Sequence, residues 1–236
     1  MSPNGKVYLI PSFLHENTRE LIPSYVIKAI QECEVFFVEN ERTARRYLKS
    51  VWKDMVIDQY EWFTIHEKEE ELKSTFVRLL KAGKTIGIIS EAGCPGIADP
   101  GQILVSVAQE ENFTVKPLVG PSSILLALMA SGMNGQQFQF VGYLPIDSKE
   151  RGKKIEELEI ESMKKNCTQV FIETPYRNNQ LLQALLQRCK ESTSLCIAVD
   201  ITSPDEHIKT KTIQEWKKQL PELNKKPTIF LLLAKK

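Results

Sequence analysis

The sequence lacks the patterns that mark membrane, secreted or metal-binding proteins. No apolar run approaches the ~20 residues that a membrane-spanning helix needs, and the first ten residues are too polar for a signal peptide. The five cysteines are scattered, with no CxxC pair and no neighbouring histidine cluster, which predicts neither a zinc site nor a disulfide framework. We therefore expect a cytoplasmic protein without a metal and without a membrane partner.

The chain also lacks a strong excess of either charge. Its net charge is +1 at pH 7, from 31 Lys and Arg against 30 Asp and Glu in 236 residues, which argues against a strongly basic nucleic-acid binder. The charge is uneven, because residues 1–148 hold 14 basic and 18 acidic residues and residues 149–236 hold 17 and 12. If an anionic polymer binds, the second half is expected to supply the positive field.

Residues 85–101, TIGIISEAGCPGIADPG, are what the rest of the chain is organised around. An apolar run typical of a buried strand comes first, then three glycines and two prolines, then a helical pattern. This is the layout of a ligand loop at the carboxyl end of a parallel sheet. Glu91 and Asp99 suit a cofactor with cationic parts, although neither a GxGxxG nor a P-loop pattern is present. A long, rigid strand-to-helix connection is the alternative.

Short apolar strands and amphipathic helices alternate along the chain, which predicts an α/β fold. The first part is expected to form a mostly parallel, doubly wound sheet, and the second part a mixed sheet, with domains at residues 1–118 and 119–236 and a linker with its first helix at about 119–135. The expected strands are residues 6–10, 34–38, 55–58, 85–89, 114–119, 138–144, 168–172, 195–199 and 227–234. The expected helices are residues 25–33, 42–50, 67–81, 102–110, 124–131, 148–165 and 177–189.

The string ISEAGCPGIADPG resembles the S-D-A-G-T-P-x-I-S-D-P-G motif of the tetrapyrrole methylase superfamily, the class III S-adenosylmethionine-dependent methyltransferases. It is most similar to the branch that methylates a cytidine ribose 2'-oxygen in small-subunit ribosomal RNA. Further segments match the same branch in order along nearly the whole chain: VENERTARRYL, HEKEEEL, LVGPSSILLALMASG, VGYLP and IETPYR.

The resemblance implies that S-adenosylmethionine lies between two α/β domains and that the protein works as a homodimer. The residues that it assigns to the cofactor are Pro11, Glu91, Gly93, Cys94, Pro95, Ile97, Ser122, Ser123, Glu173, Asp200 and Thr228. It offers Glu39, His66 and Glu67 as candidates for a base that activates an acceptor hydroxyl. For these three, a surface ion pair or a structural role is the alternative.

Two departures from the family pattern bear on the acceptor. The family's P-x-G-N loop reads Pro11-Ser12-Phe13-Leu14 here, and Thr228 stands near the place of a family glutamate. The family's RNA-modifying members also often carry a small C-terminal module beyond the matched region. The leading hypothesis is methyl transfer to RNA, at a ribose hydroxyl of ribosomal RNA. A tetrapyrrole or other small-molecule acceptor, and a cofactor-binding interaction protein without catalysis, are the alternatives.

Overall fold

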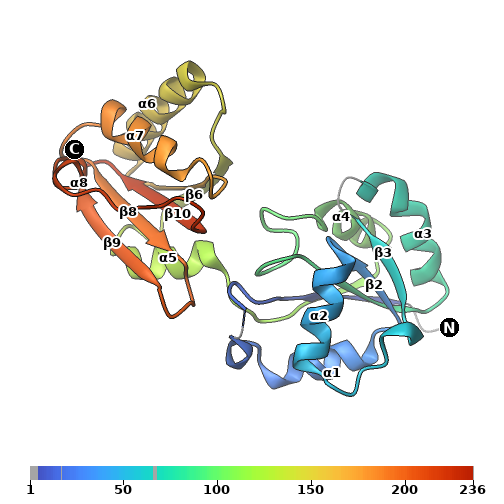
Figure 1. Cartoon of the computed structure of the whole chain (residues 1–236). Coiled ribbons are helices and arrows are strands. Elements are labelled where there is room, and N and C mark those ends of the chain that lie inside the picture. The colour runs from blue at the N-terminus through green and yellow to red at the C-terminus, as the bar shows by residue number, and fades with distance from the viewer. Residues whose placement is uncertain (1–4, 17, 66–67, 236) are drawn as a thin grey trace. The chain divides into compact units, whose positions relative to one another are not determined.

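The computed structural model of the chain describes residues 5–16, 18–65 and 68–235. It divides into two compact units, residues 1–122 and 123–236, each built around its own five-stranded sheet (Figure 1). The α/β class with one parallel and one mixed sheet, predicted from the alternating pattern, is confirmed.

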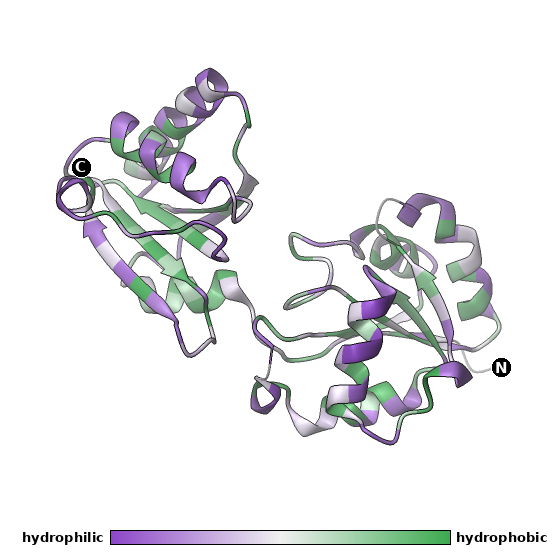
Figure 2. Ribbon diagram, in the orientation of Figure 1, coloured by the Kyte–Doolittle hydropathy of each residue, from purple (hydrophilic) through white to green (hydrophobic). Residues whose placement is uncertain are grey.

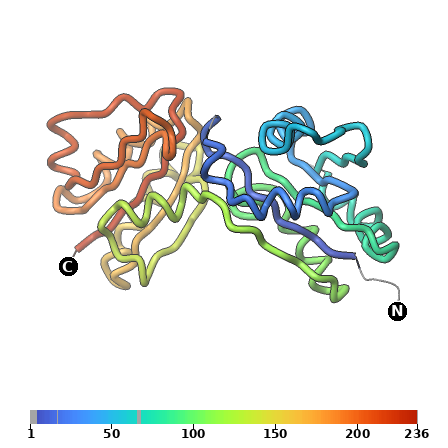
Figure 3. Tube along the Cα trace, turned by 90° about the horizontal axis from the view of Figure 1, so that it is seen from below, coloured from blue at the N-terminus to red at the C-terminus, as the bar shows by residue number. Residues whose placement is uncertain are grey.

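All strand pairs of the first sheet are parallel. The strand order is β3-β2-β4-β1-β5. Strand β1 therefore lies between β4 and β5, which come much later in the sequence. Figure 3 shows β1 and β5, in blue and light green, running side by side. The strands are β1 (Lys6–Ile10), β2 (Val35–Val38), β3 (Glu61–Thr64), β4 (Thr85–Ile89) and β5 (Thr114–Pro117).

Two pairs of helices cover the two faces of this sheet. Because side chains alternate along a strand, Tyr8 and Phe36 join the apolar cluster of the first helix pair, while Val7 and Phe37 join that of the second. The connection after β1 therefore leads to one face of the sheet, and the connection after β4 leads to the other. In open parallel sheets, ligands bind in the crevice that forms between two such connections. The first pair is α1 (Ser24–Glu32) and α2 (Glu41–Val51), and the second is α3 (Glu69–Lys81) and α4 (Gln102–Glu110).

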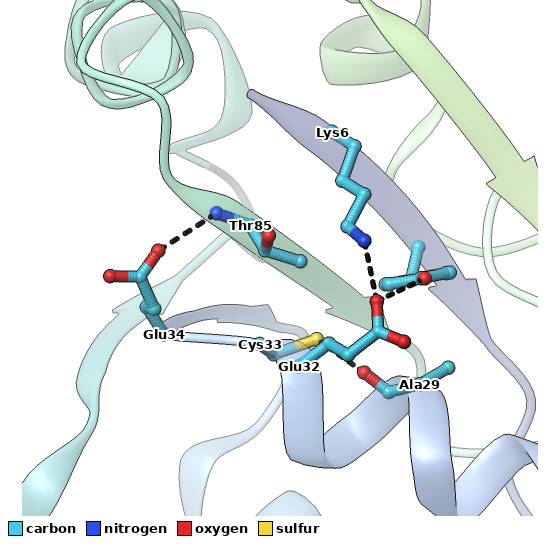
Figure 4. Close-up of polar contacts among 7 residues, drawn as sticks. Lys6, Ala29, Glu32, Cys33, Glu34 and Thr85 are labelled. Atoms are coloured by element: carbon cyan, nitrogen blue, oxygen red, sulfur yellow. Dashed lines mark hydrogen bonds and ion pairs between the residues drawn. The ribbon is translucent and has the colours of Figure 1, made fainter. Parts of the chain in front are cut away.

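Charged side chains tie the strands together at the amino edge of the sheet, opposite that crevice. Glu32, at the end of α1, accepts hydrogen bonds from Lys6 (2.5 Å) and Tyr8 (2.7 Å) (Figure 4). Glu34 precedes β2 and accepts from the Thr85 backbone N–H at 3.1 Å. The Lys6 and Tyr8 bonds lower the pKa of the Glu32 carboxyl. These bonds link the end of α1 to β1 and the start of β2 to the start of β4.

The second unit has a mixed sheet of order β6-β7-β10-β8-β9, in which only β6 and β7 pair in parallel. Phe171, Phe230 and the other side chains of one face pack under α6, α7 and α8, while α5 packs against β9 and β10. The strands are β6 (Phe138–Tyr143), β7 (Thr168–Ile172), β8 (Ser194–Val199), β9 (His207–Thr212) and β10 (Thr228–Leu233). The helices are α5 (Ser123–Ser131), α6 (Ser148–Lys165), α7 (Asn178–Arg188) and α8 (Ile213–Lys218). In the part of the chain that the structure describes, no helix is long and apolar enough to cross a membrane.

The third predicted strand, residues 55–58, is wrong. Residues 57–59 form a 3-10 turn, and the third strand is β3. Within this run Met55 is buried in the cluster of α1 and α2 and Ile57 packs against that cluster, whereas Val56 is exposed. The strand itself is an edge strand whose Trp62 and Phe63 are only half-buried, each stacked on an aromatic side chain of β2.

The glycine in the middle of β4 is expected to be essential for packing. A Cβ at Gly87 would lie 2.7 Å from Ile10 Cδ1 and 2.8 Å from Phe36 Cδ1, so Gly87→Ala should lower the free energy of unfolding by about 1–3 kcal/mol. Gly135→Ala is the control, because nothing lies within 4 Å of its added Cβ. Urea denaturation of both variants checks this, and equal stabilities would contradict it.

Candidate functional site

The loop after β4, residues 90–101, bends through conformations that favour glycine. Gly93 and Gly96 have φ of 71° and 78°, and Ala98 is left-handed as well, at 64°. The Gly96 N–H donates to the Pro100 carbonyl at 3.1 Å and closes the tip. The glycines therefore leave backbone exposed where a Cβ would otherwise stand.

Hydrogen bonds join this loop to the loops after β1 and β5. The Ser12 N–H donates to the Gly93 carbonyl at 2.8 Å, and the Ser12 hydroxyl donates to the Ser90 carbonyl at 3.0 Å. The Cys94 thiol points at the Pro121 carbonyl, 3.5 Å away. Three loops thus converge at the carboxyl edge of the first sheet.

The loop after β1 packs tightly on the glycine that precedes Pro121. A Cβ at Gly120 would lie 2.1 Å from Pro11 Cβ, so only glycine allows this contact. The Pro11 carbonyl accepts from the Tyr47 hydroxyl of α2 at 2.5 Å. Although Phe13 replaces the family glycine, the beginning of this loop still meets the Gly-Pro-Ser segment.

A buried carboxylate holds the far end of the loop. Glu69, the first residue of α3, accepts from the backbone N–H groups of Gly101 (3.1 Å) and Leu104 (3.0 Å) in the first turn of α4. A negative charge there is favoured, because the N–H groups at a helix start have no intrahelical partner. Sequence reasoning missed this residue, since its partners lie 32 and 35 positions away and nothing local marks it.

Three carboxylates gather around the start of the loop. Glu39 follows β2 and accepts from the Glu91 N–H at 2.9 Å, while the Glu91 carboxylate accepts from the Thr43 hydroxyl of α2 at 3.1 Å. Burial, with the charges of Glu39 and Glu91, raises the pKa of the Asp99 carboxyl to about 6. Burial and the Asp99 charge raise the pKa of the Cys94 thiol. The excess of negative charge suits a ligand with cationic groups.

The second unit brings three predicted residues to one edge of its sheet. Glu173 follows β7, Asp200 follows β8 and Thr228 begins the antiparallel strand between them. Glu173 is buried, and its Oε1 accepts from the Arg177 guanidinium at 2.7 Å and the Thr174 N–H at 2.6 Å. Its Oε2 has no hydrogen-bond partner in the described part of the chain. Asp200 has a left-handed φ of 48°, and the Thr228 hydroxyl donates to the Lys226 carbonyl.

The predicted residues fall into these two groups. Pro11, Glu91, Gly93, Cys94 and Pro95 lie with Glu39 at the carboxyl edge of the first sheet, and Ile97 is half-exposed at the loop tip. Ser122 ends the first unit, and Ser123 begins α5. His66 and Glu67 lie outside the described residues. Their roles toward a ligand stay predictions.

The sequence as a whole is similar to one family and to a set of named proteins. The profile of "Tetrapyrrole (Corrin/Porphyrin) Methylases" matches residues 18–217. Proteins named "Ribosomal RNA small subunit methyltransferase I" are 34% identical over 154 residues (Vibrio cholerae), 30% over 182 (Halalkalibacterium halodurans) and 33% over 178 (Haemophilus influenzae). The matches cover 65%, 77% and 74% of this chain. They span only 52%, 60% and 62% of those relatives.

Solved structures share the fold at low sequence identity. The methyltransferase CobJ superposes with a TM-score of 0.63 at 16% identity, covering 99% of this chain and 95% of its own. Uroporphyrin-III C-methyltransferase from Thermus thermophilus, in complex with S-adenosyl homocysteine, superposes with a TM-score of 0.56 at 16% identity, covering 97% of each chain. At this identity the likeness establishes the fold alone.

The raised pKa of Asp99 makes stability depend on pH. Between its ordinary value of 3.8 and its folded value of about 6, the folded protein keeps a proton that the unfolded chain has lost. Stability from this group is therefore full below pH 4 and falls as pH rises to 6. Asp99→Asn removes this loss, so the variant should be more stable than the parent at pH 8 by about 1 kcal/mol, after discounting for partial exposure.

Urea denaturation at pH 4 and pH 8 measures this difference, which should vanish at pH 4. The same substitution at exposed Asp54 controls for the removal of one negative charge. A difference that is larger at pH 4 than at pH 8 would show that Asp99 is not the group that titrates.

Proposed function

Because this chain belongs to the tetrapyrrole (corrin/porphyrin) methylase family, we propose that it transfers a methyl group from S-adenosylmethionine to RNA. The proposed acceptor is a ribose 2'-oxygen of small-subunit ribosomal RNA. The observation that carries the proposal is the 30–34% identity to proteins named for ribosomal RNA methylation. Because the chain spans 52–62% of their length, activity and acceptor both await a direct test.

The convergent loops at the carboxyl edge of the first sheet are the proposed cofactor contacts of that unit. Gly93 lets backbone approach the ligand, and the nearby carboxylates attract the sulfonium and ammonium of S-adenosylmethionine. Ser122 immediately precedes α5 and Ser123 begins it, so both stand where the helix dipole favours the cofactor's carboxylate. In the second unit, Glu173, Asp200 and Thr228 are proposed as further contacts.

The sulfonium is itself a good leaving group, so the protein chiefly has to place the acceptor in line with the methyl. A ribose hydroxyl also needs a base or a polarising group. Glu39, His66 and Glu67 are the proposed candidates, and one oxygen of Glu39 already holds the Glu91 N–H. Asp99 joins them, because its pKa of about 6 lies nearer neutral pH than that of an ordinary carboxyl.

A homodimer in a reducing cytoplasm is part of the proposal. The scattered cysteines, four of them buried, support a reducing compartment. The second candidate is a methyltransferase for a tetrapyrrole or another small molecule. The observation in its favour is the loop after β1, which carries Phe13 and Leu14 where the family's P-x-G-N loop has glycine and asparagine.

Adding a methyl at Gly93 is expected to impair cofactor binding. Its Cβ would lie 3.3 Å from both Leu14 Cδ2 and the Pro121 carbonyl oxygen, at the point where the loops converge. Gly93→Ala should therefore weaken S-adenosylmethionine binding at least tenfold in isothermal titration calorimetry, since about 1.4 kcal/mol of lost contact is a factor of ten.

Gly96→Ala is the matched control. Its φ of 78° is as unfavourable for alanine, but its Cβ would meet nothing closer than 3.8 Å. The two variants thus share the backbone strain and differ in crowding. Equal affinities in both would place the cofactor elsewhere, and an unmodified chain that binds no S-adenosylmethionine would overturn the methyltransferase proposal.

The acceptor is tested by transfer of radiolabelled methyl to fractionated RNA, protein and small-molecule pools from the source organism. Label is expected in small-subunit ribosomal RNA and should survive mild alkali as a 2'-O-methylated dinucleotide. Label in the small-molecule pool alone would favour the tetrapyrrole-type acceptor. Cofactor binding without label in any pool would favour an interaction protein that has lost catalysis.

A further inference from the structure

A hollow of about 250 Å³ opens beside the candidate cofactor loop within the first unit. One wall is the loop after β1, a second is α2, and the third is Glu91 and Ala92 at the start of the loop after β4. It adjoins the convergence of the three loops through Ser12, Leu14 and Glu91. No local sequence pattern marks this hollow, because its walls come from three distant segments.

We propose that this hollow receives an unstacked nucleotide of a single-stranded RNA segment. Phe13 stacks on its base, and Arg46 binds an adjoining phosphate. The inference rests on the proposed RNA methyltransferase function and assigns that function a substrate subsite.

Phe13 is placed for stacking. It lines the hollow and is half-buried, and its ring meets the Tyr47 ring edge-on, at 5.0 Å and 86°. Tyr47 is buried and fixed by its bond to the Pro11 carbonyl, so the phenylalanine ring is held from one side. Single-stranded RNA is commonly bound by splaying a base onto such an aromatic ring. The family's P-x-G-N loop has glycine at this position.

The charge of α2 suits the phosphate backbone. Four of its eleven residues, ERTARRYLKSV, are Arg or Lys and one is Glu, and Figure 2 shows the helix as largely hydrophilic. Arg42, Arg46 and Lys49 recur at helical spacing on the exposed side. Arg46 pairs with Glu16 at 3.3 Å, but both side chains are more than 60% exposed. Such a pair is weak and screened by salt, so a phosphate can replace Glu16.

The size of the hollow and the hydrogen-bonding groups in its lining favour a nucleotide over a macrocycle. Pockets for drug-sized ligands measure roughly 300–1,000 Å³, and this hollow falls below that range, so four linked pyrrole rings exceed it. Thr43, Ser50 and Glu91 add hydroxyls and a carboxylate to its lining. A carboxylate is the acceptor that proteins use for the amino group of cytosine.

The test measures binding of a short fluorescent single-stranded RNA by the full chain, using anisotropy across a range of salt concentrations. Phe13→Leu keeps an apolar side chain against Tyr47 but removes the ring, and it should weaken binding about tenfold. Phe13→Tyr should restore it. Arg46→Gln should weaken binding and reduce the slope of log K against log salt by about 1.

Arg78→Gln is the matched control, because Arg78 is an exposed arginine on α3, which covers the opposite face of the sheet. It should change neither affinity nor slope. Calorimetry should give the same S-adenosylmethionine affinity for all four variants, which excludes misfolding as the cause.

The outcomes separate this inference from the proposed function. If Phe13→Leu and Arg46→Gln bind RNA as the unmodified chain does, the hollow is not the RNA subsite, even where methyl transfer to RNA is observed. If the unmodified chain binds the cofactor but no RNA, the subsite and the RNA acceptor both fail. If these two variants instead impair methylation of a small molecule, the hollow belongs to that acceptor and the inference is overturned.

Discussion

The hydrogen bond from the Ser12 N–H to the Gly93 carbonyl joins the two loops whose directions diverge. The connection after β1 leaves for one face of the sheet and the connection after β4 for the other, so without a cross-link their ends would separate. This bond, the Ser12 hydroxyl on Ser90 and the close contact of Pro11 with Gly120 hold them together. Glu39 and Glu69 add charged anchors at the start and the end of the longer loop. The candidate site is therefore an edge of the sheet at which three loops are bonded to one another.

The strand and loop at residues 85–101 could be predicted because the residues that determine them are consecutive in the sequence. A buried parallel strand is apolar throughout, and breakers of regular structure are visible one residue at a time. The edge strands show the opposite case. β9, HIKTKT, alternates lysine and threonine with no apolar face, because an edge strand covered on one side needs charge against unwanted pairing. It was missed for that reason. Helix α8 was missed because its six residues are too few to show a helical period.

Side-chain partnerships were the least predictable part of the site. Glu69 reads as one acid in a run of three, and only the packing of α3 against α4 reveals that it binds the loop. Glu39 matched a family motif and was predicted as a base, yet in the structure one of its oxygens fixes the Glu91 backbone. The loop after β1 shows that the fold tolerates a large side chain in place of a glycine. Phe13 replaces a glycine, and the ring is accommodated against Tyr47 without disturbing the contact of Pro11 with Gly120.

Glu173 is buried, and only one of its two carboxylate oxygens is hydrogen-bonded to the residues that the structure describes. One of its oxygens is saturated by Arg177 and Thr174, while the other is cut off from water with no donor facing it in the described part of the chain. Such an atom is under-solvated in the free protein, and only a group that brings its own proton can relieve that deficit. Burying this oxygen without a donor therefore costs the folded second unit stability.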